Sequence, residues 1–312
     1  MRAVRCKEGK VFVADVEPPR GDGVRVKVAS VGICGSDLHM LAAGFPIAVT
    51  LGHEMAGVTD NGTPVAIEPI APCGHCPQCV RGEYNLCELG GQMVCGVGRD
   101  GGMAEQLVVP ERALVPLPAG VSVEDACLVE PLAVAVHGIA RVKLSSKDRV
   151  AVVGGGSIGL CAVAAAKVVT NEVYLIARHD AQRSAGERLG ARLPADGTFD
   201  VVVDCAGTTE SLTEAVDLCR PGATLLMLAT YWQGLTLPAF GVTMKELRLC
   251  TASMYCRQGL VRDIDVAASL LATNPQIADC IITHRLPLDA AAQAFAIAAN
   301  RVQGAIKVIL RP

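Results

Sequence analysis

Residues 148–159 read Asp-Arg-Val-Ala-Val-Val-Gly-Gly-Gly-Ser-Ile-Gly, and an alanine-rich segment follows. The first six residues predict a short buried strand, and the alanine-rich segment predicts a helix. A G-x-G-x-x-G pattern alone is a weak signal, but strand, glycines and helix in this order are the fingerprint of a dinucleotide-binding turn. We therefore expect the backbone amides at the helix start to bind a pyrophosphate. The residues predicted to form this turn are Gly154, Gly156, Ser157, Ile158 and Gly159.

Three further strands are predicted beyond this turn. Apolar runs at residues 172–176, 199–207 and 223–229 alternate with helical segments, which predicts a doubly wound parallel sheet. Ligands bind such sheets at the carboxyl ends of the strands. We therefore expect the small residues Ala206 and Ala229, near two of these ends, to contact the cofactor.

The residues after the 172–176 strand bear on the choice of cofactor. An acid there binds the ribose 2′-hydroxyl of NAD and would repel the 2′-phosphate of NADP. Here the strand is followed by Ala177 and Arg178, a small residue beside a guanidinium, which suits a phosphate. Asp180 lies close enough to keep NAD as an alternative. The sequence thus favours NADP over NAD, and a solvated surface charge is the other interpretation of Arg178.

A set of potential metal ligands lies upstream of the dinucleotide motif. It contains the thiol of Cys34, the imidazole of His53 and the carboxylate of Glu54. Zinc sites that keep one coordination position open for a substrate use such sulfur, nitrogen and oxygen ligands. Glu130 lies in an apolar run, where an unpaired ionised carboxylate would be costly, and is a further candidate near the metal.

Four more cysteines lie close together, at Cys73, Cys76, Cys79 and Cys87. Their short separations predict a closed tetrathiolate zinc site, because such loops cannot easily spread their sulfurs apart. A closed site has no open position for substrate, so its role is to stabilise the lobe 73–87. A nucleic-acid-binding zinc ribbon is the alternative, but the nearby charged residues form no basic surface. Those residues are Arg81, Glu83 and Glu88.

The sequence around these motifs predicts mainly β-structure. Alternating residues between 11 and 31 predict antiparallel strands, and Asn61-Gly62 predicts a hairpin turn. Helical spacing covers residues 121–141. After the dinucleotide unit, an alanine-rich helix ending at Arg301 and a strand at 305–310 are expected to return to the first domain.

Length and composition indicate a globular chain. Its 312 residues suit two domains, and 51% hydrophobic residues can bury a large core. A net charge of −3 without long charge runs gives no footprint for nucleic acid or an anionic membrane. No secretory peptide or membrane span is predicted. Most of the 14 cysteines lie singly in apolar segments, as free thiols of a reducing compartment do. We expect a soluble, cytoplasmic protein that binds a small molecule.

Taken in order, these motifs resemble the zinc-dependent medium-chain dehydrogenase/reductase family, and the resemblance covers essentially the whole chain. The nearest branch is that of the sorbitol, threonine and secondary-alcohol dehydrogenases, because one glutamate follows His53 and another precedes Pro131. The motifs that carry the resemblance are residues 32–39 (GICGSDLH), residues 52–54 (GHE), the four-cysteine lobe, residues 129–133 (VEPLA), residues 154–159 and residues 304–308 (GAIKV).

The resemblance implies an α/β fold of two domains. A GroES-like, β-rich catalytic domain would comprise residues 1–136 and 257–312, with a Rossmann NAD(P)-binding domain at residues 137–256. It implies two zinc ions per chain, one catalytic and one structural. Homodimers or homotetramers are usual in the family.

Residue roles also follow from the resemblance. Cys34 and His53 are implied to bind the catalytic zinc, with Glu54 or Glu130 completing the ligand set. Ser36 is implied as the first group of a proton relay that ends at His39, whose ordinary pKa suits exchange with water near neutral pH. The implied reaction is reversible hydride transfer between a secondary alcohol or polyol and NAD(P), with zinc as a Lewis acid.

Two other functions are compatible with this fold. A metal-independent, NADPH-dependent quinone or enone reductase would not need the predicted zinc ligands, and a non-catalytic nucleotide-binding relative would not need an intact set. The chain is also shorter than is usual for the family, in the hairpin after Glu54 and in the spacer before His53, so the substrate cannot be carried over. Phe45 in this spacer and Tyr231-Trp232 are candidate pocket residues, with core packing as the alternative for the latter pair.

Overall fold

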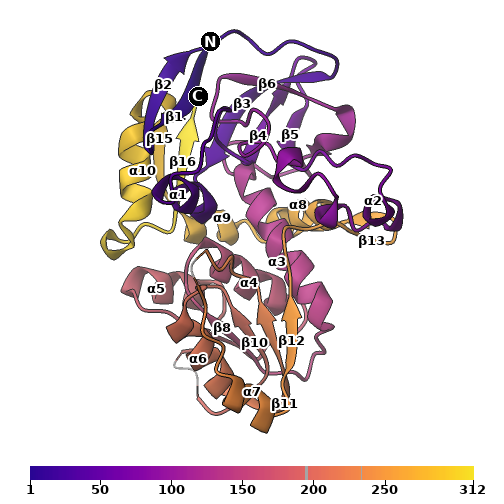
Figure 1. Cartoon of the computed structure of the whole chain (residues 1–312), viewed down its shortest axis with the longest axis vertical. Coiled ribbons are helices and arrows are strands. Elements are labelled where there is room, and N and C mark those ends of the chain that lie inside the picture. Colours follow the sequence, from indigo (N-terminus) through magenta and orange to yellow (C-terminus); the bar gives the residue numbers. More distant parts are fainter. Residues whose placement is uncertain (194–195, 233) are drawn as a thin grey trace. The chain divides into compact units, whose positions relative to one another are not determined.

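The chain forms two compact units in the computed structural model, which describes residues 1–193, 196–232 and 234–312 (Figure 1). The first unit comprises Met1–Glu130, Cys256–Ala278 and Ile282–Pro312. The second comprises Pro131–Tyr255 and Asp279–Ile281. Among the residues described, no helix has the length and apolarity needed to cross a membrane.

A seven-stranded sheet forms the centre of the first unit, in the order β15-β16-β3-β4-β5-β7, with β6 paired to β3. Its strands are β3 (Val24–Gly32), β4 (Glu54–Thr59), β5 (Pro64–Ile67), β6 (Gln106–Val109), β7 (Leu114–Pro116), β15 (Ile282–Pro287) and β16 (Lys307–Arg311). Two hairpins complete the β-structure: β1 (Arg2–Lys7) with β2 (Lys10–Asp15), and β13 (Arg257–Gln258) with β14 (Val261–Arg262). The predicted turn at Asn61-Gly62 joins β4 to β5, and a positive φ of 85° at Gly62 explains the glycine.

The C-terminal strand returns to the first unit, as predicted. β16 pairs with β3, and Ile309 lies opposite Gly32. Helix α10 packs against β16 and β2 (Figure 1). The helices of this unit are α1 (Gly35–Ala42), α2 (Pro77–Arg81), α8 (Asp263–Thr273) and α10 (Ala291–Ala299), while α9 (Gln276–Ile281) and α3 (Val129–Val142) each contain a boundary between the units.

The second unit contains a five-stranded parallel sheet in the order β12-β11-β10-β8-β9, which confirms the predicted α/β class. Its strands are β8 (Val150–Val153), β9 (Val173–Ile176), β10 (Phe199–Asp204), β11 (Cys219–Met227) and β12 (Arg248–Thr251). Its helices are α4 (Ser157–Lys167), α5 (Asp180–Arg188), α6 (Thr209–Leu218) and α7 (Ala239–Met244). The strand β8, the glycine turn and α4 follow one another as predicted, and α4 and α6 pack on the sheet.

Two predicted boundaries were wrong. The helix expected over residues 121–141 begins only at Val129, because a turn and a 3₁₀ segment, Ala126–Leu128, precede it. Strand β11 begins at Cys219 instead of Ala223, and a register irregularity against β10 accommodates Pro221 and Gly222.

Candidate functional site

The ends of two paired strands bring the predicted metal ligands together in the first unit. Gly32 at the end of β3 lies opposite Glu54 at the start of β4. Cys34 therefore emerges from β3 beside His53, which directly precedes β4. One ligand atom from each of Cys34, His53 and Glu54 lies within 4.8 Å of the others. Cys34 thus forms one cluster with His53 and Glu54, which lie 19 and 20 positions further along the chain.

The side chain of His53 is held between two residues of α1. The Ser36 hydroxyl oxygen lies 3.3 Å from Nε2 of His53, and Asp37 Oδ1 lies 3.6 Å from its Nδ1. Asp37 is fully buried, and its other oxygen accepts a hydrogen bond from the Cys34 amide at 3.0 Å. A carboxylate facing Nδ1 fixes the orientation of the ring and leaves Nε2 as the nitrogen that could bind a metal. Asp37 was not predicted as a site residue, although an acid in the first turn of a helix is a recognisable signal.

Glu54 is bound by a buried lysine that sequence analysis also missed. The Lys307 ammonium lies 2.6 Å from each Glu54 carboxylate oxygen and donates to the Ile33 carbonyl at 3.0 Å. Lys307 is 2% exposed. Burial lowers the pKa of Lys307, but the opposite charge of Glu54 raises it by more, so the net shift of this pKa is upward. A Cβ atom on Gly32 would lie 1.9 Å from Glu54 Oε2, so only glycine fits there. The signal for Lys307 was a lone lysine in an apolar strand.

Glu130 lies in the first turn of α3, outside this group of three ligands. It is buried, and burial raises the pKa of its carboxyl to about 7. His53 and Lys307 oppose this rise, whereas Glu54 adds to it, so Glu130 is electrostatically coupled to the cluster. A metal ion beside this carboxyl would favour its ionised form and lower the pKa.

The cluster as a whole favours a positive charge. Burial lowers the pKa of His53, yet the acidic groups around it, chiefly Asp37 and Cys34, raise that pKa well above its ordinary value. The Nδ1 of His53 and Oδ1 of Asp37 are buried without a hydrogen-bond partner among the described residues. Thiolate, imidazole and carboxylate ligands around a buried, electron-rich centre fit a zinc ion.

His39 lies at the exposed face of α1, one turn beyond Gly35. Its pKa is lowered by burial and, to a smaller extent, by Arg301. A guanidinium nitrogen of Arg301 would lie 3.7 Å from a Cβ atom on Gly35. The structure therefore places a cation over the first turn of α1, near the predicted end of the proton relay.

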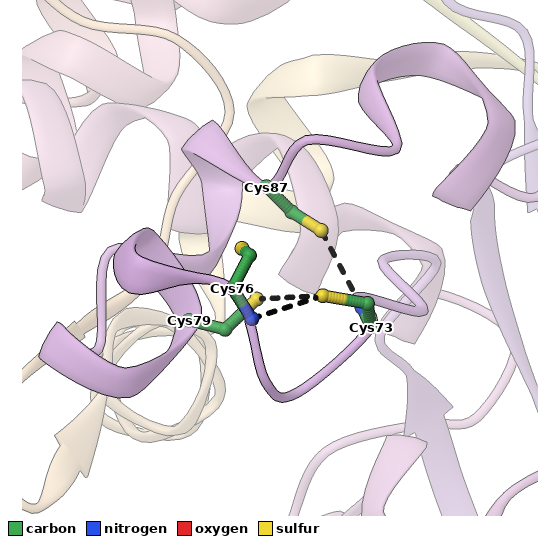
Figure 2. A group of neighbouring side chains, drawn as sticks. All are labelled: Cys73, Cys76, Cys79 and Cys87. Atoms are coloured by element: carbon green, nitrogen blue, oxygen red, sulfur yellow. Dashed lines mark hydrogen bonds between the residues drawn. The ribbon is translucent and has the colours of Figure 1, made fainter.

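The four cysteines of the lobe form a second cluster (Figure 2). The ligand atoms of Cys73, Cys76, Cys79 and Cys87 all lie within 4.8 Å of one another. The sulfurs of Cys73 and Cys79 are 3.9 Å apart, close to the ~3.8 Å that Zn–S bonds of ~2.3 Å give in a tetrahedron. The backbone amides of Glu88 and Cys79 lower the pKa of the Cys76 thiol to about 6. These sulfurs fit a closed zinc site.

A buried polar network anchors this lobe to the rest of the first unit. The Tyr84 hydroxyl donates to Glu68 Oε1 at 2.6 Å and lies 3.0 Å from the carbonyl oxygen of Cys256. Arg262 at the end of β14 pairs with the other Glu68 oxygen at 3.2 Å. Tyr84 lies between Cys79 and Cys87 in the sequence, so this network fixes the lobe at its centre.

The predicted cofactor residues converge at the carboxyl edge of the parallel sheet. A Cβ atom on Gly159 would lie 1.8 Å from the Gly154 carbonyl oxygen, and a Cβ on Gly154 would lie 3.0 Å from the amide of Ala206. A Cβ on Gly155 would lie 2.7 Å from that of Ala177. Gly207 similarly approaches Ala229. The glycine turn and three strand ends thus form one surface in the second unit.

The residues of this surface fit the phosphates of a dinucleotide. A Cβ atom on Gly156, the N-cap of α4, would meet no atom within 4 Å, so space remains in front of the helix. The Ser157 hydroxyl oxygen is buried without a hydrogen-bond partner in the described part of the chain. An open helix start with an unsatisfied hydroxyl is the setting in which a pyrophosphate binds.

Arg178 is exposed just beyond β9. The nearby Asp180 is already paired with Arg183. Arg183 forms an ion pair with Asp180 and also donates to the carbonyl oxygens of Ala177 and Arg178, at 3.0 and 2.8 Å. Because its carboxylate is already paired, Asp180 is a weaker candidate for binding a ribose hydroxyl.

Comparison with known proteins agrees with these two sites. Residues 20–119 match the family model of the alcohol dehydrogenase GroES-like domain, and residues 157–272 match that of the zinc-binding dehydrogenase. The chain is 32% identical to galactitol 1-phosphate 5-dehydrogenase of Escherichia coli (strain K12), with 99% of each chain covered. It is 30% identical to L-galactonate-5-dehydrogenase of the same organism, over 95% of this chain and 94% of the relative.

A solved structure shows the same architecture. It is that of a protein from Sinorhizobium meliloti 1021 described as a zinc-binding dehydrogenase and bound to NADP. The two share a TM-score of 0.86 and 31% identity over 100% of this chain and 99% of the other. The GroES-like domain and the parallel Rossmann-type sheet predicted from the sequence are therefore confirmed. The chain belongs to the zinc-dependent medium-chain dehydrogenase family and is an oxidoreductase of the alcohol dehydrogenase type.

Proposed function

We propose that this enzyme transfers a hydride reversibly between a secondary alcohol group of a polyol and NADP. The observation that carries this proposal is the convergence of Cys34 and His53 on one buried centre that also has two acidic side chains, Glu54 and Glu130. The curated relatives named above act on galactitol 1-phosphate and L-galactonate according to their names, and both names denote polyhydroxylated carbon chains. A secondary hydroxyl within such a chain is the substrate group that we infer.

We infer that Cys34, His53 and Glu130 hold the catalytic zinc. Glu54 is the alternative third ligand, but Lys307 already binds both of its oxygens. Glu130 has no such clamp among the described residues, and a metal ion would stabilise the ionised form of its buried carboxyl. When bound, zinc would act as a Lewis acid that lowers the pKa of a substrate hydroxyl. Asp37 would keep His53 oriented, and Lys307 would hold the Glu54 carboxylate in place beside the centre.

The proton of the substrate hydroxyl is proposed to leave through side chains of α1. The Ser36 hydroxyl lies next to Nε2 of His53 and is the first group that can accept it. His39 on the exposed face of the same helix would pass it to water. Its lowered pKa keeps the imidazole neutral, and hence able to accept a proton, to lower pH than usual.

NADP is the proposed cofactor because three features of the second unit suit it. The glycine turn would hold the pyrophosphate, and Arg178 would pair with the 2′-phosphate. Asp180, the acid that would oppose that phosphate, is paired with Arg183. The structure from Sinorhizobium meliloti was solved with the same cofactor. We propose the second unit as the cofactor-binding domain and the first as the catalytic domain.

We also propose a homodimer formed through β12. This strand lies at the edge of the five-stranded sheet, so one row of its backbone groups faces outward. Its Leu249 is 43% exposed, and Phe240 in the preceding helix α7 is 81% exposed. Antiparallel pairing of two such strands about a twofold axis would pair the free backbone groups of both edges in one closed contact.

The 14 free thiols suit a reducing compartment, and we propose the cytoplasm.

A panel of polyols and ketoses, with NADP and NAD side by side, tests the proposal. We expect oxidation of secondary alcohols, followed at the nicotinamide absorbance, and about two zinc ions per chain by elemental analysis.

Cys34→Ser should lose the catalytic zinc and all turnover but retain NADPH binding. The matched control is Cys127→Ser, a buried cysteine outside the ligand set, which should keep both metals. Full turnover after the catalytic zinc is removed by a chelator would contradict the proposal and favour a metal-independent reductase.

A further inference from the structure

Asp204 at the carboxyl end of β10 joins two loops of the second unit. One of its carboxylate oxygens accepts hydrogen bonds from the amides of Ala206 and Gly207, at 2.9 and 3.3 Å. The other lies 2.8 Å from the Tyr231 hydroxyl and 3.2 Å from the Ser211 hydroxyl. These contacts connect the loop after β10 with the loop after β11.

The backbone of Asp204 strengthens the same connection. Its carbonyl oxygen accepts hydrogen bonds from the amides of Leu228 and Ala229, both at 3.0 Å. Ala206 and Ala229 are the residues predicted to contact the cofactor at these two strand ends. A Cβ atom on Gly207 would lie 3.0 Å from the Cβ of Ala229, so the two loops also touch directly.

Among the residues that the structure describes, the buried carboxylate of Asp204 has only uncharged hydrogen-bond partners. Asp204 is 0% exposed, and all four of its side-chain donors are neutral N–H or O–H groups. A buried anion without a cation is costly unless its hydrogen bonds are all made. Displacing either loop would leave the charge partly unsatisfied. The two loops therefore share a single anchor that resists their separation.

We propose that Asp204 is a positioning residue for the nicotinamide cofactor, acting through Tyr231 to hold residues 229–231 against residues 205–207. This inference rests on the proposed function, because it assumes that these loops contact the cofactor. Tyr231 is then neither a pocket wall nor simple core packing, the two roles considered from the sequence. Its hydroxyl fixes the loop that carries Ala229.

Tyr231→Phe removes this one hydrogen bond and keeps the aromatic ring. Hydrogen bonds to charged groups contribute about 1.5–3 kcal/mol, so we expect at least about a tenfold rise in the Kd and KM for NADP(H). The kcat at saturating cofactor should change little, because the hydroxyl is bonded to Asp204 between the two loops. Trp232, the single tryptophan of the chain, directly follows Tyr231, and its emission can report NADPH binding.

Tyr174→Phe is the matched control. Its hydroxyl also donates to a carboxylate of the second unit, Glu172, at 3.2 Å, but from β9 and not from a strand end predicted to contact the cofactor. It should bind NADPH like the wild type. Asp204→Asn, which removes the charge at nearly constant volume, should weaken binding more than Tyr231→Phe; if it fails to fold, the tyrosine pair still decides.

The outcomes separate this inference from the proposed function. A rise in Kd and KM for Tyr231→Phe alone supports it. A lower melting temperature for Tyr231→Phe with unchanged Kd and KM would show a merely structural role and overturn it. If the wild type binds neither NADPH nor NADH, the proposed function fails, and this inference fails with it.

Discussion

In the proposed relay, the pKa of His39 determines the pH range in which its imidazole can accept a proton. Burial lowers this pKa, and the guanidinium of Arg301 lowers it further. In the proposed relay, alcohol oxidation requires neutral His39 as the proton acceptor, so the lowered pKa should extend activity toward acid pH.

Arg301→Gln should raise the pKa of His39, because it removes the positive charge that opposes protonation. The acid limb of the kcat/KM profile for alcohol oxidation should then move to higher pH. The control is Arg285→Gln, which changes an arginine that pairs with Asp125 elsewhere in the first unit and should leave the profile in place. An unmoved acid limb in Arg301→Gln would argue against His39 as the relay.

Arg178→Ala tests the assignment of the cofactor phosphate. Loss of a charge-assisted contact costs about 1.5–3 kcal/mol, so the KM for NADP should rise about tenfold or more. The KM for NAD should change little, since NAD lacks the 2′-phosphate. Arg192→Ala serves as the control, because Arg192 already pairs with Glu172. Equal loss with both cofactors would count against a role in phosphate binding.

The residues with distinctive chemistry could be predicted from the sequence, but the partners that hold them could not. Cys34, His53 and Glu54 were named from their residue types and spacing, and the structure places them together. Lys307 was missed because its partner Glu54 lies 253 positions away. No local pattern shows such a contact, which depends on the pairing of β16 with β3.

At the level of elements, the glycine turn depends on two glycines for different reasons. A Cβ atom on Gly159 would lie 1.8 Å from the backbone oxygen of Gly154, which no side chain can relieve. A Cβ atom on Gly156 would meet nothing within 4 Å of the protein. Gly159 is needed by the fold, and Gly156 leaves space for a ligand.

Gly159→Ala should therefore disrupt the packing of α4 on β8 and lower the stability of the second unit by about 1–3 kcal/mol or more. Gly156→Ala should fold normally but bind NADPH more weakly. Thermal unfolding by circular dichroism and NADPH titration distinguish these effects. Equal stability of the two variants would show that the close contact at Gly159 is relieved in solution.

The four-cysteine lobe is a second element with a testable anchor. Tyr84→Phe leaves Glu68 with one hydrogen bond fewer in a buried setting, so the lobe should lose about 1.5–3 kcal/mol of stability. The urea midpoint of zinc release to a chelating dye measures this change. Tyr174→Phe, in the other unit, should leave that midpoint unchanged. An unaltered midpoint in Tyr84→Phe would mean that the zinc ion alone holds the lobe.

The elements with strong local signals were predictable, and their boundaries were less so. The order of β8, glycine turn and α4 follows from apolar periodicity and glycine chemistry, which are local properties. The start of α3 at Val129 was missed because apolar residues at 121–128 share the same helical spacing. Turn hydrogen bonds, not spacing, determine where that helix begins.

At the level of the whole molecule, the proposed dimer predicts a particle of about twice the 32.4 kDa chain mass. Leu249→Lys places a charge on the edge strand β12 and should shift the protein to monomers in light scattering. Leu260→Lys is the control, because Leu260 is 95% exposed on the hairpin of β13 and β14 in the other unit. A Leu249→Lys protein that remains dimeric would place the interface elsewhere.

The place of β16 in its sheet has a consequence for biosynthesis. The stretch 131–255 leaves the ribosome as one uninterrupted piece that can collapse early, whereas the first unit must wait for a strand made much later. Until that strand arrives, Glu54 has no ammonium beside it. A nascent chain would thus be able to bind nucleotide before it could catalyse, which delays hydride chemistry until translation has passed Lys307.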